Sequence, residues 1–198
     1  MVCDRDKTVY DGDKCILLIA KYLKQKGLLK HDQVVLTKMS NIGIIKALGE
    51  AGISVLEADV GDKYVLEMLE KNDLVLGGEN SGHIINRTLL DTGDGVLNAA
   101  FLLHILDETG LSLAEQVGSV VMYPDKLVNL RDIDTRLVKH PEVVQLVAKI
   151  QKEFDTDGKL LVRPSGTEPV IRVYVSARSM SLVEKTIERV VTLFNELK

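Results

Sequence analysis

The sequence contains few cysteines, few aromatic residues and no long apolar run. Its two cysteines, Cys3 and Cys15, are too few for a disulfide framework or a zinc site, which favours a reducing cytoplasmic location. Aromatic residues make up 4% of the chain and Trp is absent, so the core must be built from Val, Ile, Leu and Ala. No apolar run reaches the roughly 18 residues that cross a bilayer. The opening MVCDRDKTVYDGD also has no apolar segment of a signal peptide, so we expect no membrane partner.

The formal net charge of −4 provides no broad basic field of the kind that binds nucleic acid. The few aromatic residues also give little surface on which bases could stack. We therefore expect no nucleic-acid partner. An anionic substrate would have to be held by local groups.

The first 120 residues alternate between helical and strand-like patterns. Apolar spacing predicts helices, with Asp13 as N-cap of the first, over 15–27, 40–50, 62–72, 93–110 and 112–120. Apolar and β-branched runs predict strands over 33–38, 53–60, 73–79 and 83–86. This alternation predicts an α/β fold with a mixed, largely parallel sheet.

The pattern changes at about 119–121, where we expect a domain boundary. Alternating apolar residues after Pro124 predict a strand, and HPEVVQLVAKIQKEF predicts a helix with Pro141 in its first turn. Two strands, KLLVRP and EPVIRVYVSA, then precede a terminal helix over 181–198, for which Ser181 is the expected cap. These elements predict a small α+β domain over 121–198.

The loop GGENSGH (77–83) follows an apolar strand, where α/β sheets tend to bind ligands. The Glu79 carboxylate and the Ser81 hydroxyl suit hydrogen bonds to sugar hydroxyls, and His83 could exchange a proton near neutral pH. The alternative is a polar turn whose glycines close a hairpin. The pattern alone leaves both interpretations open.

The loop RPSGTEP (163–169) lies between two predicted strands. The Arg163 guanidinium can bind a phosphate through two N–H groups, and Ser165 and Thr167 add hydroxyl donors. Gly166 could let backbone N–H groups converge on an anion, and Arg172 supplies a second cation. The alternative is a hairpin with surface arginines, but two arginines around S-G-T favour an anion site.

Several acidic pairs resemble cation ligands but have structural explanations. Asp11 and Asp13 precede a helix, where Asp caps the first turn, and Asp94 also fits a helix start. His104 lies in an apolar helix without a partner at ligand spacing. Lys63 begins a helix and is either surface charge or a contact to an anion.

Taken together, five motifs resemble the α-D-phosphohexomutase superfamily, and bacterial phosphoglucosamine mutases in particular. They occur in the order and spacing of that family and are MSNIG (39–43), VGDKYV (60–65), GGENSGHII (77–85), TGDG (92–95) and RPSGTEPVIRVYV (163–175). The resemblance covers essentially the whole chain. It implies a three-layer α/β domain 3 over 1–120, with 1–10 as the tail of domain 2. A TATA-box-binding-protein-like α+β domain 4 would follow over 121–198.

The resemblance also implies roles for individual residues. The sugar-binding loop would comprise Glu79, Asn80, Ser81, Gly82 and His83, with His83 a candidate for proton transfer. The phosphate-binding loop would comprise Arg163, Ser165, Gly166 and Thr167, with Arg172 nearby. Lys63 would match a basic position that contacts substrate.

Two family motifs are absent from this sequence: the T-[AS]-S-H-N-like serine loop and the D-G-D-x-D-R metal loop. The chain is therefore expected to be a C-terminal fragment that lacks domains 1 and 2 and is inactive alone. The complete enzyme would interconvert glucosamine 6-phosphate and glucosamine 1-phosphate through a phosphoserine and Mg²⁺. The alternatives are a phosphomannomutase or phosphoglucomutase, or a non-catalytic phosphosugar-binding module. A homodimer stays open.

Overall fold

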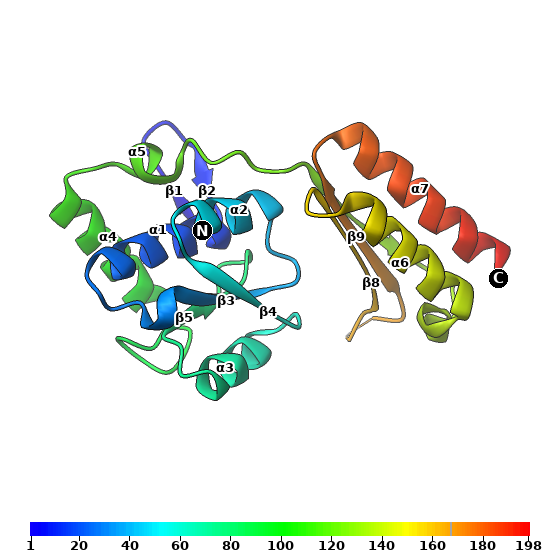
Figure 1. Cartoon of the computed structure of the whole chain (residues 1–198), viewed down its shortest axis with the longest axis horizontal. Coiled ribbons are helices and arrows are strands. Elements are labelled where there is room, and N and C mark those ends of the chain that lie inside the picture. The colour runs from blue at the N-terminus through cyan, green and yellow to red at the C-terminus, as the bar shows by residue number, and fades with distance from the viewer. Residues whose placement is uncertain (167) are drawn as a thin grey trace. The chain divides into compact units, whose positions relative to one another are not determined.

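The chain divides between Val121 and Met122, next to the boundary expected at 119–121. The computed structural model describes residues 1–166 and 168–198, which form unit 1 (Met1–Val121) and unit 2 (Met122–Lys198) (Figure 1). Each unit has its own sheet and its own buried apolar residues.

Unit 1 has the predicted alternation of strands and helices. Its elements in chain order are β1 (Val2–Cys3), β2 (Val9–Tyr10), α1 (Gly12–Gln25), the 3₁₀ turn η1 (Lys30–Asp32), β3 (Gln33–Thr37), α2 (Ile42–Glu50), β4 (Ser54–Ala58), α3 (Asp62–Lys71), β5 (Leu76–Gly78), β6 (Ile84–Asn86), α4 (Gly95–Thr109) and α5 (Leu113–Val117). The main sheet has the order β4-β3-β5-β6, with β3 parallel to β4 and β5, and β6 antiparallel to β5. This confirms the mixed, largely parallel sheet.

Helices cover both faces of this sheet, as two adjacent glycines of β5 demonstrate. A Cβ on Gly77 would lie 2.8 Å from the Val65 Cγ1 atom of α3, whereas a Cβ on Gly78 would lie 3.0 Å from the Ile16 Cδ1 atom of α1. Successive strand residues point to opposite faces, so α1 and α3 lie on opposite sides. Figure 1 likewise shows α2 and α3 on opposite sides of β3 and β4. The three layers follow from this arrangement.

The start of α1 differs from the prediction. Asp11, and not Asp13, is the N-cap, and its side chain accepts a hydrogen bond from the Lys14 N–H at 3.0 Å. Asp13 is buried in the first turn, where it accepts from Ser40 Oγ at 2.8 Å and from the Asn41 N–H at 2.7 Å. The prediction was wrong because both aspartates precede the apolar helical pattern, which places a helix start only to within about two residues.

A short hairpin of β1 and β2 precedes α1 and was not predicted. The Asp4 carboxylate accepts hydrogen bonds from the Asp6 and Thr8 N–H groups, both at 2.9 Å, and from the Tyr10 hydroxyl at 3.0 Å. These contacts agree with a structural role for Asp4.

Unit 2 is the predicted α+β arrangement. Its elements are β7 (Asp125–Leu130), the 3₁₀ turn η2 (Thr135–Lys139), α6 (Pro141–Phe154), β8 (Gly158–Pro164), β9 (Ile171–Ala177) and α7 (Met180–Glu196). The antiparallel sheet has the order β7-β9-β8. Ser179 caps α7 through the Leu182 N–H at 3.3 Å, so the prediction of Ser181 was wrong. Ser181 lies exposed inside the helix. The sequence did not distinguish the two serines, because both stand at the start of the same apolar pattern with one residue between them.

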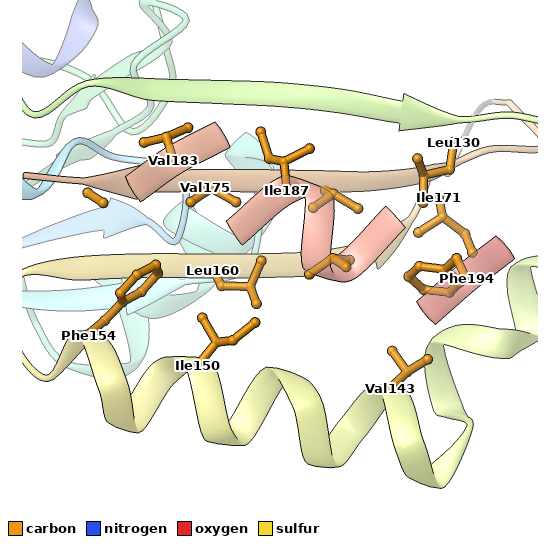
Figure 2. Packing of buried hydrophobic residues seen from close by; sticks show 13 residues of the cluster. Leu130, Val143, Ile150, Phe154, Leu160, Ile171, Val175, Val183, Ile187 and Phe194 are labelled. Carbon is orange, nitrogen blue, oxygen red and sulfur yellow. The ribbon is translucent and has the colours of Figure 1, made fainter. Parts of the chain in front are cut away.

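Both helices of unit 2 pack on one face of the sheet (Figure 2). Alternate residues of β9, from Ile171 to Ala177, are fully buried in this cluster with Ile150 of α6 and Phe194 of α7. The strand period of two therefore turns the intervening residue Arg172 toward the face opposite α6 and α7.

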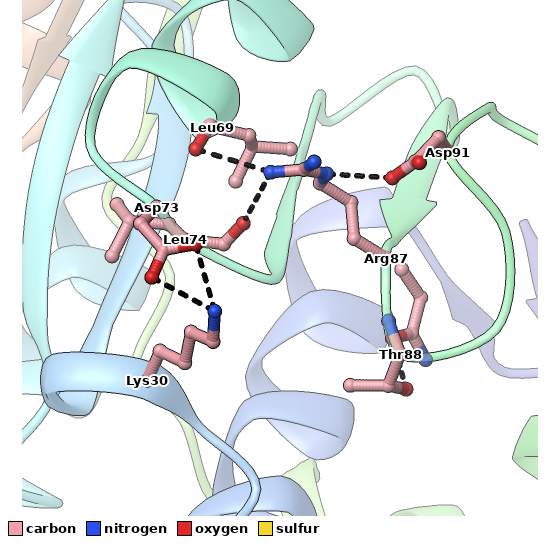
Figure 3. A network of polar contacts seen from close by, with 8 residues as sticks. Lys30, Leu69, Asp73, Leu74, Arg87, Thr88 and Asp91 are labelled. Carbon is pink, nitrogen blue, oxygen red and sulfur yellow. Dashed lines mark hydrogen bonds and ion pairs between the residues drawn. The ribbon is translucent and has the colours of Figure 1, made fainter.

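Arg87 connects three segments of unit 1 beyond the end of β6 (Figure 3). Its Nε donates to Asp91 Oδ1 at 2.7 Å, and its Nη1 donates to the carbonyls of Leu74 at 3.2 Å and Leu69 at 3.4 Å. The guanidinium thus ties the segment after β6 to the end of α3 and the approach to β5. These contacts hold β5 and β6, which carry the loop described next.

Candidate functional site

The loop over 79–83 joins β5 to β6 as a tight hairpin. The Glu79 N–H donates to the His83 carbonyl at 2.9 Å, and the Gly82 N–H donates to the Glu79 carbonyl at 3.0 Å. The hairpin alternative and the ligand-loop interpretation are therefore compatible. The backbone is a hairpin whose tip presents polar side chains.

Glu79 is the centre of a polar cluster at this tip. Its side chain is 12% exposed, and its Oε1 accepts a hydrogen bond from the Gly61 N–H at 2.9 Å. Its Oε2 lies 3.4 Å from Ser81 Oγ and 3.7 Å from His83 Nδ1. The VGDKYV and GGENSGH motifs therefore meet through the backbone N–H of Gly61 and the carboxylate of Glu79, two residues that lie 18 positions apart in the sequence.

The other predicted residues of this loop are more open to solvent. Ser81 is exposed, and the His83 side chain is 66% exposed, with its Nδ1 3.5 Å from Ser81 Oγ. The carbonyl of Asn80 accepts a hydrogen bond from the Gly12 N–H at 3.0 Å. Lys63 is exposed in the first turn of α3, and its ammonium lies 4.6 Å from the ring centroid of Tyr64. A fixed carboxylate with exposed hydroxyl and imidazole groups around it can donate to and accept from a polyhydroxylated ligand.

In unit 2, the second predicted loop joins β8 to β9. The Ser165 N–H donates to the Val170 carbonyl at 2.9 Å, and Ser165 Oγ accepts from the Glu168 N–H at 3.3 Å. Gly166 is exposed, with open space where a Cβ would be. Thr167, also predicted for this loop, lies outside the described residues, and the expected convergence of N–H groups involves it.

Two arginines flank this loop in register. Arg163 of β8 lies directly opposite Arg172 of β9, on the face of the sheet away from α6 and α7. The Arg172 side chain is 28% exposed, and its Nη2 lies 3.6 Å from Glu168 Oε2. Among the described residues, no hydrogen-bond partner lies within reach of the buried Arg172 Nε. Two guanidinium groups at the base of one loop concentrate positive charge and N–H donors, which is the chemistry that binds a phosphate.

The Cys15 and His104 side chains lie outside these loops and have structural surroundings. Burial raises the pKa of the Cys15 thiol to about 11, so it stays protonated and unreactive. His104 contacts Tyr22 and Glu108 at distances of 3.2 and 3.3 Å. Within the described part of the chain, no three His, Cys, Asp or Glu side chains gather where they could share a metal ion. The same residues include no helix both long and apolar enough to traverse a membrane.

Two residues of the first cluster were not identified from the sequence. Gly61 and Gly12 each contribute a backbone N–H, which carries no side-chain signature. The available signal was their place in short Gly-Asp motifs, VGDK and YDGD, at the start of a predicted helix. The first N–H groups of a helix have no partner within the helix and are usually hydrogen-bonded to other groups. The sequence does not specify which acceptor lies near each of them.

Comparison with known proteins identifies both units. Residues 11–123 match the phosphoglucomutase/phosphomannomutase alpha/beta/alpha domain III, and residues 124–193 match the C-terminal domain of the same family. The phosphoglucosamine mutase of Leuconostoc mesenteroides is 45% identical over 194 residues, which are 98% of this chain and 43% of the relative. That of Limosilactobacillus reuteri is 42% identical over 188 residues, which are 94% of this chain and 42% of the relative.

Solved structures share the fold at lower identity. An Aspergillus fumigatus N-acetylphosphoglucosamine mutase in complex with GlcNAc-6P and magnesium has a TM-score of 0.76 and 20% identity, covering 96% of this chain and 48% of that one. An N-acetylglucosamine-phosphate mutase in its substrate complex has a TM-score of 0.77 and 22% identity, covering 96% of this chain and 45% of that one. The chain thus spans less than half the length of these proteins. It belongs to the phosphoglucomutase/phosphomannomutase family and contains domain III and the C-terminal domain of that family.

Proposed function

We propose that this chain is the substrate-binding half of a phosphoglucosamine mutase. The complete enzyme would interconvert glucosamine 6-phosphate and glucosamine 1-phosphate, for amino-sugar nucleotide and cell-wall precursor synthesis. Two relatives that match almost the whole chain carry that name, at 45% and 42% identity, which supports this substrate class. Because the chain spans less than half of each relative, the reaction is assigned to the complete protein.

The observation that carries the proposal is the arginine pair of unit 2. Like charges directly opposite in an antiparallel sheet destabilise it. An anion beside Arg163 and Arg172 would add to the charge compensation that Glu168 gives Arg172, and it would supply an acceptor for the buried Arg172 Nε. We assign the non-reacting phosphate of the substrate to Arg163, Ser165, Gly166, Thr167 and Arg172.

We assign recognition of the sugar to the cluster of unit 1. Glu79 and Ser81 would bind ring hydroxyls, Asn80 would complete the loop, and His83 would orient or transfer a proton. The bond from the Gly61 N–H holds one carboxylate oxygen of Glu79, which leaves the other directed to Ser81 and His83. Lys63 is assigned a contact to an anionic group, for which its exposure at the start of α3 is suitable.

The phosphoserine and Mg²⁺ of the family are assigned to domains that precede this chain. Mg²⁺ neutralises charge on a transferring phosphoryl group when it is bound. The candidate carboxylates here do not fit it, because those of Asp11 and Asp13 accept hydrogen bonds from Lys14, Ser40 and Asn41. The chain alone should therefore not catalyse the reaction.

Three further assignments accompany this function. The domain III match begins at residue 11, which supports residues 1–10 as the tail of domain 2. A cytoplasmic location and a homodimer stay predictions. Cell fractionation tests the first, and sedimentation of the complete protein tests the second.

Turnover by the complete protein, with the preceding domains restored, tests the function. The expected result is preference for glucosamine 6-phosphate over glucose 6-phosphate and mannose 6-phosphate, and no turnover by the 198-residue chain alone. Preference for either other sugar phosphate would make the protein a phosphoglucomutase or phosphomannomutase. No turnover on any of the three would favour a non-catalytic phosphosugar-binding module.

A further inference from the structure

The first residue of α1 lies against the backbone of the Glu79 loop. The Gly12 N–H donates to the Asn80 carbonyl at 3.0 Å. A Cβ on Gly12 would lie 2.1 Å from the Glu79 carbonyl oxygen and 2.7 Å from the Gly82 nitrogen. These contacts are with backbone atoms, so no side-chain rotation could make room for a methyl group.

The helix that carries Gly12 cannot easily withdraw from the loop. The apolar side chains of α1 from Cys15 to Ala20 are all buried. Asp13, which is fully buried, fixes the first turn through Ser40 Oγ at 2.8 Å and the Asn41 N–H at 2.7 Å. A methyl group added at Gly12 should therefore displace the loop and not the helix, because the loop is the more exposed of the two.

We infer that Gly12 is a positioning residue that sets the location of the Glu79 loop for sugar binding. The helix supplies a fixed base, and the absent Cβ lets the loop approach until its carbonyl reaches the Gly12 N–H. Glu79 then lies within reach of the Gly61 N–H at 2.9 Å. This inference rests on the proposed function, because it assigns the loop to a sugar phosphate.

The chain offers a matched control for substitution of Gly12. Gly95 is also the first residue of a long helix, α4, but nothing lies within 4 Å of the position of its Cβ. Gly12→Ala and Gly95→Ala therefore make the same chemical change at the same helical position. Only the first change would place a methyl group against the Glu79 loop.

The experiment measures the Kd of glucosamine 6-phosphate and of orthophosphate by calorimetry for the wild-type chain and both variants. Misplacing a binding group by about 1 Å can cost roughly a hundredfold in rate. We expect Gly12→Ala to raise the Kd of glucosamine 6-phosphate about tenfold or more and to leave that of orthophosphate unchanged. Gly95→Ala should change neither Kd more than about twofold. An unchanged Kd for glucosamine 6-phosphate in folded Gly12→Ala would overturn the inference.

Amide hydrogen exchange in the wild-type chain keeps the inference testable if Gly12→Ala does not fold. Glucosamine 6-phosphate should slow exchange at Gly12, whose N–H is bonded to the loop, and not at Gly110, whose N–H is bonded within α4. Equal exchange at Gly12 with and without bound ligand would overturn the positioning role. Failure of the wild-type chain to bind glucosamine 6-phosphate would instead remove the proposed function, and this inference with it.

Discussion

Arg163 lies directly opposite Arg172 across β8 and β9, on the sheet face that α6 and α7 leave uncovered. This register places two guanidinium groups at the base of one hairpin loop. Like charges directly opposite each other disfavour an antiparallel pair, and the Glu168 carboxylate, 3.6 Å from Arg172 Nη2, offsets part of this cost. A bound anion is expected to reduce the cost further and to accept a hydrogen bond from the buried Arg172 Nε.

Arg172→Met should separate the stability of the ligand-free chain from the stabilisation that a bound anion gives. Removing the repulsion and the unpartnered Nε should raise the free energy of unfolding of the ligand-free chain by up to about 1 kcal/mol. Orthophosphate should raise the Tm of the wild type by preferential binding to the folded state, and this rise should be lost in the variant. Thermal denaturation with and without orthophosphate measures both.

Arg178→Met is the control for that change. Arg178 lies just beyond β9, and its Nη1 is 3.8 Å from Asp157 Oδ2. The Arg178→Met chain should keep the full phosphate-dependent rise in Tm. If Arg172→Met also keeps that rise, Arg172 does not bind the anion.

Glu79→Gln should weaken sugar binding without unfolding the loop. The amide keeps an oxygen that can accept from the Gly61 N–H, but it removes the charge that strengthens bonds from sugar hydroxyls. A hydrogen bond to a charged group is worth about 1.5–3 kcal/mol, so the KM of the complete enzyme should rise roughly ten- to a hundredfold. Glu67→Gln, an exposed change on α3, should leave KM unaltered. Wild-type kinetics in Glu79→Gln would remove Glu79 from the site.

Glu108 on α4 should make the stability of unit 1 depend on pH. Hydrogen bonds from Lys26 and then from Tyr22 lower the pKa of the Glu108 carboxyl below its ordinary value of 4.5, and His104 lies beside it. A pKa lowered by folding gives stability that is present above the unfolded pKa and is lost as pH falls through the folded pKa. Wild type should therefore be more stable than Glu108→Gln at pH 7, and the difference should shrink as pH falls below about 4.5.

The measurement for Glu108 is the Tm of both proteins between pH 7 and pH 3. Asp107→Asn is the control, because Asp107 is the exposed neighbour of Glu108 on the same helix. A difference between wild type and Glu108→Gln that stays constant over this range would contradict the assigned cause.

Arg87→Lys should destabilise unit 1 although it keeps the charge. A lysine ammonium cannot reach Asp91 and the carbonyls of Leu69 and Leu74 together, as the guanidinium does. Leaving these acceptors unpaired should cost about 1–2 kcal/mol of unfolding free energy in urea denaturation. Arg136→Lys, whose side chain is 89% exposed, should cost little. Equal stability of Arg87→Lys and wild type would show that the network contributes nothing.

The sequence predicted the elements well where a periodic apolar pattern was long. The helices from α1 to α7 and the strands that precede the two loops lie within a few residues of their expected ranges. Prediction of their ends was less accurate. Asp11 and Ser179 cap helices for which Asp13 and Ser181 were expected, because each pair offers two capping residues before one apolar pattern. The β1–β2 hairpin was missed because two-residue strands have no readable period.

The sequence indicated which side chains belong to the candidate site, but not the backbone groups that hold them. Glu79 and Ser81 were expected to act together because they share one loop, and they do lie together. The partners that fix this loop, Gly12 and Gly61, act through backbone N–H groups, and tertiary packing alone decides which acceptor each one meets. The opposition of Arg163 and Arg172 likewise follows from the register of β8 and β9, which the hydrophobic pattern, the turn type and the loop length set together.

The most direct test of the central claim is an NMR titration of the ¹⁵N-labelled chain with glucosamine 6-phosphate, orthophosphate and glucosamine. The account predicts that glucosamine 6-phosphate shifts amide signals in both loops, over 79–83 and 163–172. Orthophosphate should shift only the second loop, and glucosamine only the first. Shifts confined to other parts of the chain, or none in either loop at saturating glucosamine 6-phosphate, would contradict the claim that this chain binds the sugar and the phosphate of the substrate.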